Sequence, residues 1–180
     1  LPKCNAVTFH TPITRNGAYP TFHLLNSATM ELLRDDAIVV NAARGGVVDN
    51  AALLKELKTG RLHGVIDTWE NEPHISEELL RLVDIGTFHI AGYSMEGKQR
   101  ATRMALEALD NRFHLGIDKS GLAPDYVAPE ANEITRSIIA DSYNPFVDTQ
   151  LLRANVKDFE KLRSNYTLRP EPAFHKSTKE

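Results

Sequence analysis

Runs of β-forming residues alternate with helical patterns along the chain, and this alternation restricts the fold more than any other feature. The runs are Ala6 to Phe9, Ala37 to Asn41, Leu62 to Trp69 and Asp84 to Ile90. Strands that alternate with helices usually pair in parallel, because each helix carries the chain back to the starting end of the sheet. The sequence therefore predicts an α/β fold built on a parallel sheet.

Capping signals indicate a helix between the second and third runs. Asp49 is suited to cap its amino-terminal end, and Gly60 is placed to end it. Three leucines between them, Leu53, Leu54 and Leu57, fall on one helical face. These signals predict one βαβ unit.

Two further helices are indicated downstream. Ser76, followed by Glu77 and Glu78, is a cap signal for a short helix, since carboxylates favour the positive end of the helix dipole. A longer helix is predicted from Gly97 to about Gly116, because apolar residues recur there at helical spacing. This apolar stripe consists of Ala101, Met104, Ala105, Ala108, Leu109 and Phe113.

The character of the sequence changes after Gly116, where prolines interrupt short helical stretches. These stretches are Glu133 to Tyr143, Asp148 to Ala154 and Asp158 to Tyr166. The polar end, Lys176 to Glu180, is expected to fray. We therefore predict one domain over residues 1–116 and a second, small α/β or helical segment over residues 117–180.

Composition and charge exclude several classes of protein. A formal net charge of −3 gives no general attraction to nucleic acid or to acidic membranes. The single cysteine, Cys4, cannot form an intramolecular disulfide. No apolar run approaches the length of a membrane span.

Leu1 stands just before a strand-like run, so the chain is expected to begin inside a domain. We expect a soluble, cytoplasmic protein that binds neither nucleic acid nor membrane.

The strongest local signal is the segment from Val39 to Asp49, where an apolar strand leads into Ala-Ala-Arg-Gly-Gly and then into a helix cap. In an open α/β sheet, ligands bind beyond the carboxyl ends of the strands, which is where Arg44 falls. An arginine there can hold a carboxylate through two parallel hydrogen bonds. A surface arginine beside a Gly-Gly turn is the alternative interpretation.

Polar residues also follow the next two strand-like runs. In the segment Gly64 to Pro73, Asp67 and Glu72 are candidates for contacts with a ribose and with a histidine. Because this segment is rich in acidic residues, a solvated loop is the alternative interpretation. At the end of the last run, His89 lies near Gly92, whose missing side chain would let a ligand approach the backbone. A packed histidine is the alternative there.

The coincidence of three such residues favours a site over the separate alternatives. Arg44, Glu72 and His89 follow successive predicted parallel strands, so one sheet would bring them to the same crevice. A histidine oriented by a glutamate can accept a hydroxyl proton as hydride leaves the same carbon. With the arginine binding an acid, the set matches oxidation of a 2-hydroxy acid by a nicotinamide cofactor.

Common ligand-binding motifs do not occur in the sequence. No G-x-G-x-x-G is present among the ten glycines, so the usual cradle for a dinucleotide pyrophosphate is not in this chain. No metal site is predicted, because the remaining histidines lack the mutual spacing of a metal cage. Surface or packing roles are predicted for His10, His23, His63, His74, His114 and His175.

Four ordered blocks resemble the D-isomer-specific 2-hydroxyacid dehydrogenases. The blocks are Phe9 to Ile13, Asn41 to Asp49, Asp67 to Pro73 and His89 to Gly92. The resemblance implies a Rossmann-like, partial nucleotide-binding domain with NAD as the cofactor. It also implies that the segment after residue 117 belongs to a dimerisation domain, and hence a homodimer.

The same resemblance implies roles for individual residues. His89 would be the proton acceptor, Glu72 would pair with it, and Arg44 would bind the substrate carboxylate. Tyr93 would contact the substrate, which is implied to be a phosphorylated 2-hydroxy acid. The residues implied to line the NAD site are Thr11, Ala42, Ala43, Arg44, Asp67 and Gly92.

Two alternatives remain open from the sequence. Another member of the same family, acting on 3-phosphoglycerate or on glyoxylate and hydroxypyruvate, would carry the same blocks. An inactive fragment or a non-catalytic interaction module could also retain this sheet and use residues 117–180 for pairing. The second alternative arises because the family's amino-terminal half, with its glycine fingerprint, has no counterpart in this sequence.

Overall fold

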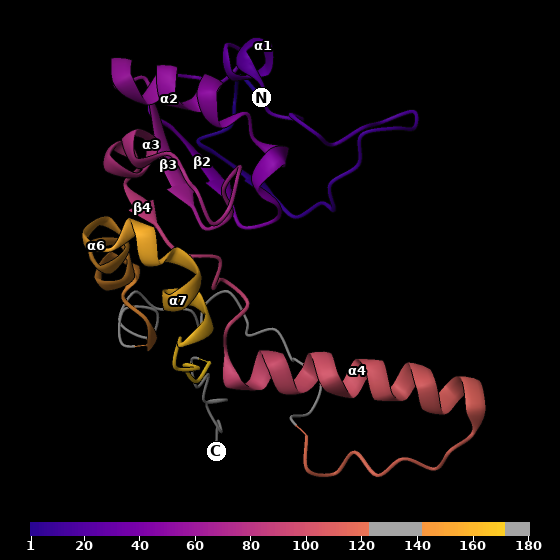
Figure 1. The fold of residues 1–180 in the computed structure, drawn as a ribbon. Coiled ribbons are helices and arrows are strands. Elements are labelled where there is room, and N and C mark those ends of the chain that lie inside the picture. The colour runs from indigo at the N-terminus through magenta and orange to yellow at the C-terminus, as the bar shows by residue number, and fades with distance from the viewer. Residues whose placement is uncertain (123–141, 172–180) are drawn as a thin grey trace, which may run out of the picture. The chain divides into compact units, whose positions relative to one another are not determined.

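The structure is a computed structural model that describes residues 1–122 and 142–171 (Figure 1). The chain divides into two compact units, one of residues 1–91 with 145–166 and one of residues 92–144 with 167–180. Compactness does not by itself identify a dimerisation domain, so the predicted boundary near residue 117 stays a prediction. Most of the predicted helical stretch Glu133 to Tyr143 lies outside the described residues, as does the end of the chain, Lys176 to Glu180.

The first unit is built on a four-stranded sheet in the order β1-β2-β3-β4, and every neighbouring pair is parallel. Its strands are β1 (Ala6–Phe9), β2 (Ala37–Asn41), β3 (Leu62–Ile66) and β4 (Ile85–Gly86). The first two strands coincide with their predicted runs. The predicted parallel α/β fold is therefore confirmed.

The last two strands are shorter than predicted, although backbone hydrogen bonds from the Thr87 amide to the Ile66 carbonyl and from the His89 amide to the Asp67 carbonyl, both 2.9 Å, continue beyond them. The buried carboxylate of Asp67 accepts hydrogen bonds from the Thr87 hydroxyl at 2.6 Å and the Ile90 amide at 2.7 Å. Its second oxygen accepts from the Ala91 amide at 3.1 Å. The carboxylate of Asp67 thus helps to fix the segment around His89 to the end of β3.

Helix α2 (Asn50–Thr59) joins β2 to β3 as predicted. The Asp49 side chain caps its first turn, and Gly60 ends it in the left-handed conformation with φ 73°. Leu53 and Leu57 are buried on the face that packs against the sheet. The local signals therefore determine both ends of this helix.

Two short helices flank the same sheet. Ser76 caps α3 (Glu77–Leu82), the short helix expected from its Ser-Glu-Glu signal. The single turn α1 (Ser27–Met30) is not among the predicted helices. Its signal is a capping box. The Asn26 side chain accepts the Thr29 amide, and the Thr29 side chain accepts the Asn26 amide.

Three helical elements near the end of the chain complete the first unit. They are α6 (Pro145–Ala154), the 3-10 turn η2 (Val156–Asp158) and α7 (Phe159–Ser164). The Thr149 hydroxyl accepts a hydrogen bond from the Gly86 amide at 3.1 Å, which joins α6 to β4. Both predicted helical stretches in this region are confirmed.

The two faces of the sheet differ in burial. In β2 the side chains of Ala37, Val39 and Asn41 are buried, whereas Ile38 between them is 40% exposed. The same alternation holds in β3, where His63 is exposed between buried neighbours. One face therefore carries the core of this unit, and the other keeps part of its apolar surface open.

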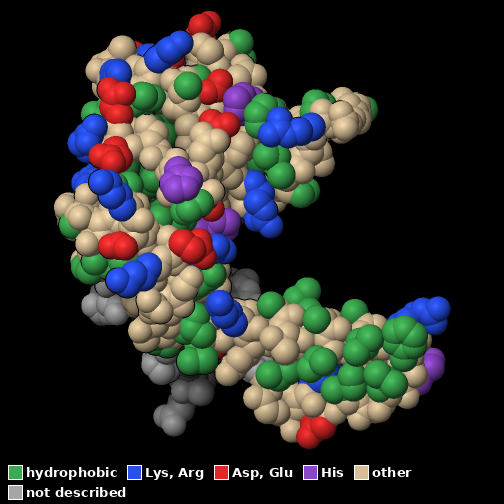
Figure 2. Space-filling view, viewed as in Figure 1, with side chains coloured by type: hydrophobic (Ala, Val, Ile, Leu, Met, Phe, Trp, Pro, Cys, Tyr) green, Lys and Arg blue, Asp and Glu red, His purple; other side chains and the backbone are tan. Residues whose placement is uncertain are grey.

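The second unit contains the long helix α4 (Met95–Phe113), which confirms the predicted long helix. It begins before Gly97 because the Ser94 hydroxyl accepts that glycine's amide at 3.0 Å. None of its residues is buried, and hydrophobic side chains lie along it in the space-filling view (Figure 2). The most exposed large members are Met95, Met104, Leu109 and Phe113.

Among the described residues, no helix is both long enough and apolar enough to cross a bilayer.

Candidate active site

The three predicted catalytic residues follow consecutive strands of the sheet. Arg44 comes after β2, Glu72 after β3 and His89 after β4. Because these strands are parallel neighbours, their carboxyl ends share one edge of the sheet. The structure therefore brings the three segments together at the edge where ligands bind in open α/β folds.

Glu72 and His89 form a direct pair. Oε2 of Glu72 lies 2.9 Å from Nδ1 of His89, and Oε1 accepts the Trp69 amide at 2.7 Å. A carboxylate can only accept, so Nδ1 of the neutral ring carries the proton and Nε2 keeps its lone pair. The imidazole is thus oriented with a basic nitrogen available for a proton.

Arg44 stands at the start of a short turn that a buried amide holds in place. The 3-10 turn η1 (Gly45–Val47) follows it directly. The side chain of Asn41, fully buried, donates to the Arg44 carbonyl at 3.0 Å and accepts from the Ala43 amide at 3.2 Å. Arg44 itself is exposed and, within the described residues, has no carboxylate within ion-pair distance. Its guanidinium can therefore receive an anion.

Asn41 was not predicted as a site residue, although a signal exists. It is a polar residue at the inward-facing end of an otherwise apolar strand, where burial requires hydrogen-bond partners. Those partners are the backbone groups that shape the Arg44 turn.

Gly45 brings the Arg44 turn into close contact with the loop that carries Glu72. A Cβ atom on Gly45 would lie 1.8 Å from the Trp69 carbonyl oxygen. Only glycine leaves room for this approach. The two loops are therefore packed backbone to backbone.

The residues predicted to line the NAD site are divided between the units. Thr11 follows β1, and Ala42 and Ala43 follow β2, so all three belong to the sheet edge described above. Gly92 and Tyr93 begin the second unit, where Lys98 Nζ lies 3.8 Å from the centre of the Tyr93 ring.

Asp67, also predicted to contact NAD, has a structural role at the same edge. Three hydrogen bonds from residues 87–91 reach its carboxylate, which is largely buried. Its contact with the cofactor stays a prediction, as do the catalytic roles of Arg44, Glu72 and His89.

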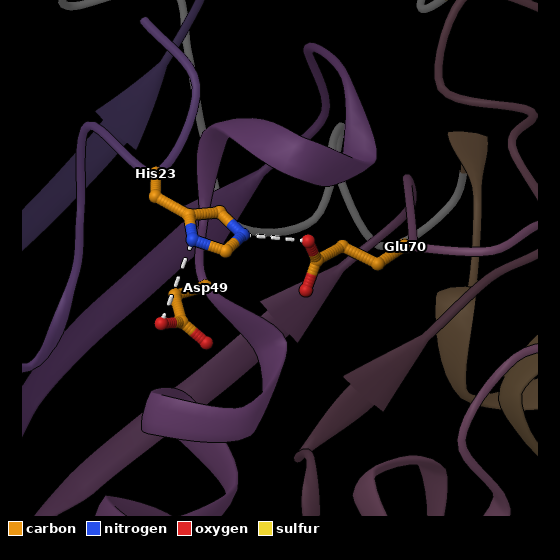
Figure 3. Close-up of side chains that lie close together, drawn as sticks. All are labelled: His23, Asp49 and Glu70. Atoms are coloured by element: carbon orange, nitrogen blue, oxygen red, sulfur yellow. Dashed lines mark hydrogen bonds and ion pairs between the residues drawn. The ribbon is translucent and has the colours of Figure 1, made fainter.

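His23 has closer polar contacts than the surface or packing role predicted for it. Its imidazole lies between Glu70, with Nε2 2.7 Å from Oε1, and Asp49, with Nδ1 3.6 Å from Oδ2 (Figure 3). All three side chains are partly buried. Because Glu70 is 47 positions away in the sequence, no local pattern could reveal this contact.

Residues 1–91 match the family described as D-isomer specific 2-hydroxyacid dehydrogenase, NAD binding domain. A Bacteroides fragilis protein named erythronate-4-phosphate dehydrogenase is 41% identical over 174 residues, which are 94% of this chain and 49% of that protein. An Enterobacter sp. protein of the same name is 41% identical over 184 residues, covering 95% of this chain and 49% of its own length. The chain thus spans about half the length of these curated relatives.

A solved structure shows the same architecture. The apo form of D-mandelate dehydrogenase from Rhodotorula graminis aligns with a TM-score of 0.55 and 27% identity, over 71% of this chain and 36% of that one. The predicted Rossmann-like fold is therefore confirmed, whereas the dimerisation segment stays a prediction.

Proposed function

Because the chain belongs to the D-isomer specific 2-hydroxyacid dehydrogenases through their NAD-binding domain, we propose that it acts as an erythronate-4-phosphate dehydrogenase. The reaction would oxidise 4-phospho-D-erythronate to 2-oxo-3-hydroxy-4-phosphobutanoate and reduce NAD⁺ to NADH. This step belongs to pyridoxal 5′-phosphate (vitamin B6) biosynthesis. The names of the relatives at 41% identity support this choice of substrate.

The observation that carries the proposal is the 2.9 Å hydrogen bond between Glu72 and Nδ1 of His89. It leaves Nε2 to take the proton of the C2 hydroxyl while the C2 hydrogen departs as hydride, so that a C=O bond replaces the C–H and O–H bonds. The neighbouring carboxylate stabilises the imidazolium that results. NAD⁺, when bound, supplies the hydride acceptor.

Arg44 would bind the substrate carboxylate. Its exposed guanidinium presents donors in the planar fork that fits a carboxylate through two hydrogen bonds. Such binding would align C2 with His89 and so convert an encounter into an oriented complex. In the same proposal Tyr93 contacts the substrate, and Thr11, Ala42, Ala43, Asp67 and Gly92 line the NAD site.

We further propose that the protein is a cytoplasmic homodimer that binds neither nucleic acid nor membrane. The exposed apolar side chains of α4 support self-association, since such surface is commonly covered by a partner. The formal charge of −3 agrees with a small-molecule substrate, because it provides no general attraction for polyanions.

A substrate panel tests the activity. The chain, and the chain fused behind the amino-terminal half of the Bacteroides fragilis relative, are each incubated with NAD⁺ and one acid. The acids are 4-phospho-D-erythronate, 3-phospho-D-glycerate and glycolate, and NADH is followed by its absorbance. We expect NADH with 4-phospho-D-erythronate. If NADH formed with one of the other two acids but not with 4-phospho-D-erythronate, the proposed substrate would be excluded.

Calorimetry with NAD⁺ separates the enzyme from a non-catalytic interaction module. We expect saturable heat of binding when NAD⁺ is titrated into the folded protein. If both the chain and the fusion are folded by circular dichroism yet bind no NAD⁺, the interaction module becomes the better interpretation.

A further inference from the structure

Three segments of the first unit meet at the side chain of His23. The first is the segment after β1 that contains His23 itself, and the second is the start of α2, where Asp49 lies. The third is the loop after β3, which provides Glu70 two positions before Glu72 (Figure 3). Two of these segments carry or adjoin predicted catalytic residues, so the contact joins parts of the chain that position the candidate site.

The position of the imidazole is well determined. The His23 amide donates to the Gly46 carbonyl at 2.7 Å, which ties its backbone to the Arg44 turn. Its ring stacks on Phe22 with centroids 3.9 Å apart, and the Arg15 guanidinium lies 3.7 Å from the Phe22 centroid on that ring. The backbone has φ 51°, a left-handed value that histidine and asparagine adopt more readily than most residues.

Glu70 extends the contact to α2. Its Oε2 accepts the Asn50 amide at 3.0 Å, while its own amide donates to Oδ1 of Asn50 at 3.1 Å. Its Oε1 receives the Nε2–H of His23, so the carboxylate bridges two segments. The adjacent residue, Trp69, donates its amide to Glu72, the partner of His89.

From these contacts we infer that His23 is a positioning residue for the proposed dehydrogenase reaction. By holding Glu70, it fixes the loop of Glu72 relative to the turn of Arg44. The inference rests on the proposed function, since it assigns His23 to the same active site without contact with the reacting atoms.

The imidazole of His23 lies between the two carboxylates. Nε2 of His23 is directed at Glu70, whereas Nδ1 is directed at Asp49, so the two carboxylates contact different nitrogens (Figure 3). The three side chains are only 22% to 30% exposed, so the hydrogen bond between His23 and Glu70 is partly shielded from water.

Two variants of His23 separate positioning from folding. His23→Asn keeps the left-handed backbone but is too short to reach Glu70, whereas His23→Gln can place an amide nitrogen near the position of Nε2. In the catalytically active form we expect the kcat of His23→Asn to fall about 10- to 100-fold, because small misplacements of catalytic groups are costly. His23→Gln should regain kcat to within about threefold of the wild type, with the KM for NAD⁺ little changed in both.

Hydrogen–deuterium exchange provides a readout that needs no substrate. In the 180-residue chain, His23→Asn should accelerate exchange of residues 45–48 and 69–72 while β2 and β3 stay protected. His63→Asn is the matched control, because His63 pairs with Asp84 at 3.2 Å on an exposed surface. That control should leave exchange and turnover unchanged.

Each outcome decides the inference. Unchanged kcat in His23→Asn, or equal losses in the Asn and Gln variants, would overturn the positioning role, and so would unchanged exchange in both loops. If no acid yields NADH with the wild type, the proposed function fails, but the exchange experiment still tests the contact. Should His23→Asn not fold, Glu70→Ala replaces it, because it removes the carboxylate that contacts both His23 and Asn50. The same losses are then expected.

Discussion

At the scale of single residues, each candidate catalytic group depends on a partner that orients it. Glu72 orients His89, the amide of Asn41 shapes the turn of Arg44, and Asp67 fixes the segment that carries His89. The partners are buried or partly buried, whereas the groups they orient reach the surface. The site therefore combines a fixed frame with accessible reactive atoms.

The proton acceptor can be tested by His89→Ala. Turnover should fall by about 10²- to 10⁴-fold, since general base catalysis is lost. Affinity for NAD⁺, measured by calorimetry, should change little because His89 is not predicted to line the cofactor site. Near-normal turnover in this variant, with His63→Ala as the control, would remove His89 from the catalytic set.

The anion contact can be tested by Arg44→Lys. A lysine keeps the charge but cannot form two parallel hydrogen bonds with a carboxylate, so kcat/KM should fall by about tenfold or more. Steady-state kinetics with the active substrate measure the change. Arg34→Lys, at an exposed arginine that contacts Asn5, should have no effect. Equal kinetics for the two variants would exclude Arg44 from substrate binding.

At the scale of elements, the site depends on how closely adjacent turns and helices approach one another. The turn η1 packs against the loop after β3 through Gly45, and the start of α4 is held by the segment around Arg169 through the Met95 amide. Both contacts involve backbone atoms, which cannot rotate away as side chains can. Substitutions at such points should therefore change stability and not only local chemistry.

Gly45→Ala tests the first contact. The added methyl group would meet the Trp69 carbonyl oxygen, so we expect a loss of about 1–3 kcal/mol in the free energy of unfolding. Urea denaturation measures this loss. Gly121→Ala is the control, because nothing lies within 4 Å of its added Cβ, and it should change stability by less than about 0.5 kcal/mol. Equal stability of both variants would contradict the close approach.

A neighbouring contact between the start of α4 and the same segment can be tested through pH at Glu96. The Glu171 amide, 2.8 Å from Oε2, together with amide donors at the start of α4, lowers the pKa of Glu96 below its usual 4.5. A lowered pKa means that the contact stabilises the fold above pH 4.5 and is lost as the pH falls through the folded value. Exchange of the Glu171 amide should therefore accelerate in acid, beyond its intrinsic pH dependence. Glu96→Gln should weaken this dependence, and identical acid profiles would contradict the assignment.

At the scale of the whole molecule, apolar surface remains open in both units. Ile38 is 40% exposed on the sheet, and Met104 and Phe113 on α4 are 66% and 59% exposed. Surface of this kind favours association, because burial of apolar area is the main driving force for contact between proteins.

Self-association through α4 can be tested by the double substitution Met104→Glu with Leu109→Glu. Charges on this face should shift the protein toward the monomer in sedimentation velocity experiments, since burying them would be costly. Thr102→Glu, at an exposed polar position of the same helix, should leave the distribution unchanged. A monomeric wild type, or the same distribution in all variants, would contradict a dimer formed through α4.

The sequence by itself determined β1, β2 and both ends of α2, because strand patterns and helix caps act over a few neighbouring residues. It also placed Arg44 and His89 at the carboxyl ends of their strands, since parallel order follows from the alternation of elements. These features depend on local chemistry that can be recognised in one stretch of chain.

Only the tertiary structure decided where β3 and β4 end and which side chains hold the site together. Asp67 binds the segment that contains His89, and His23 reaches Glu70 across 47 positions. Such contacts depend on the distance between folded segments and on the burial of polar atoms that need partners. A hydrogen bond between remote residues leaves no periodic signal in the sequence, so it becomes visible only once the sheet has brought the loops together.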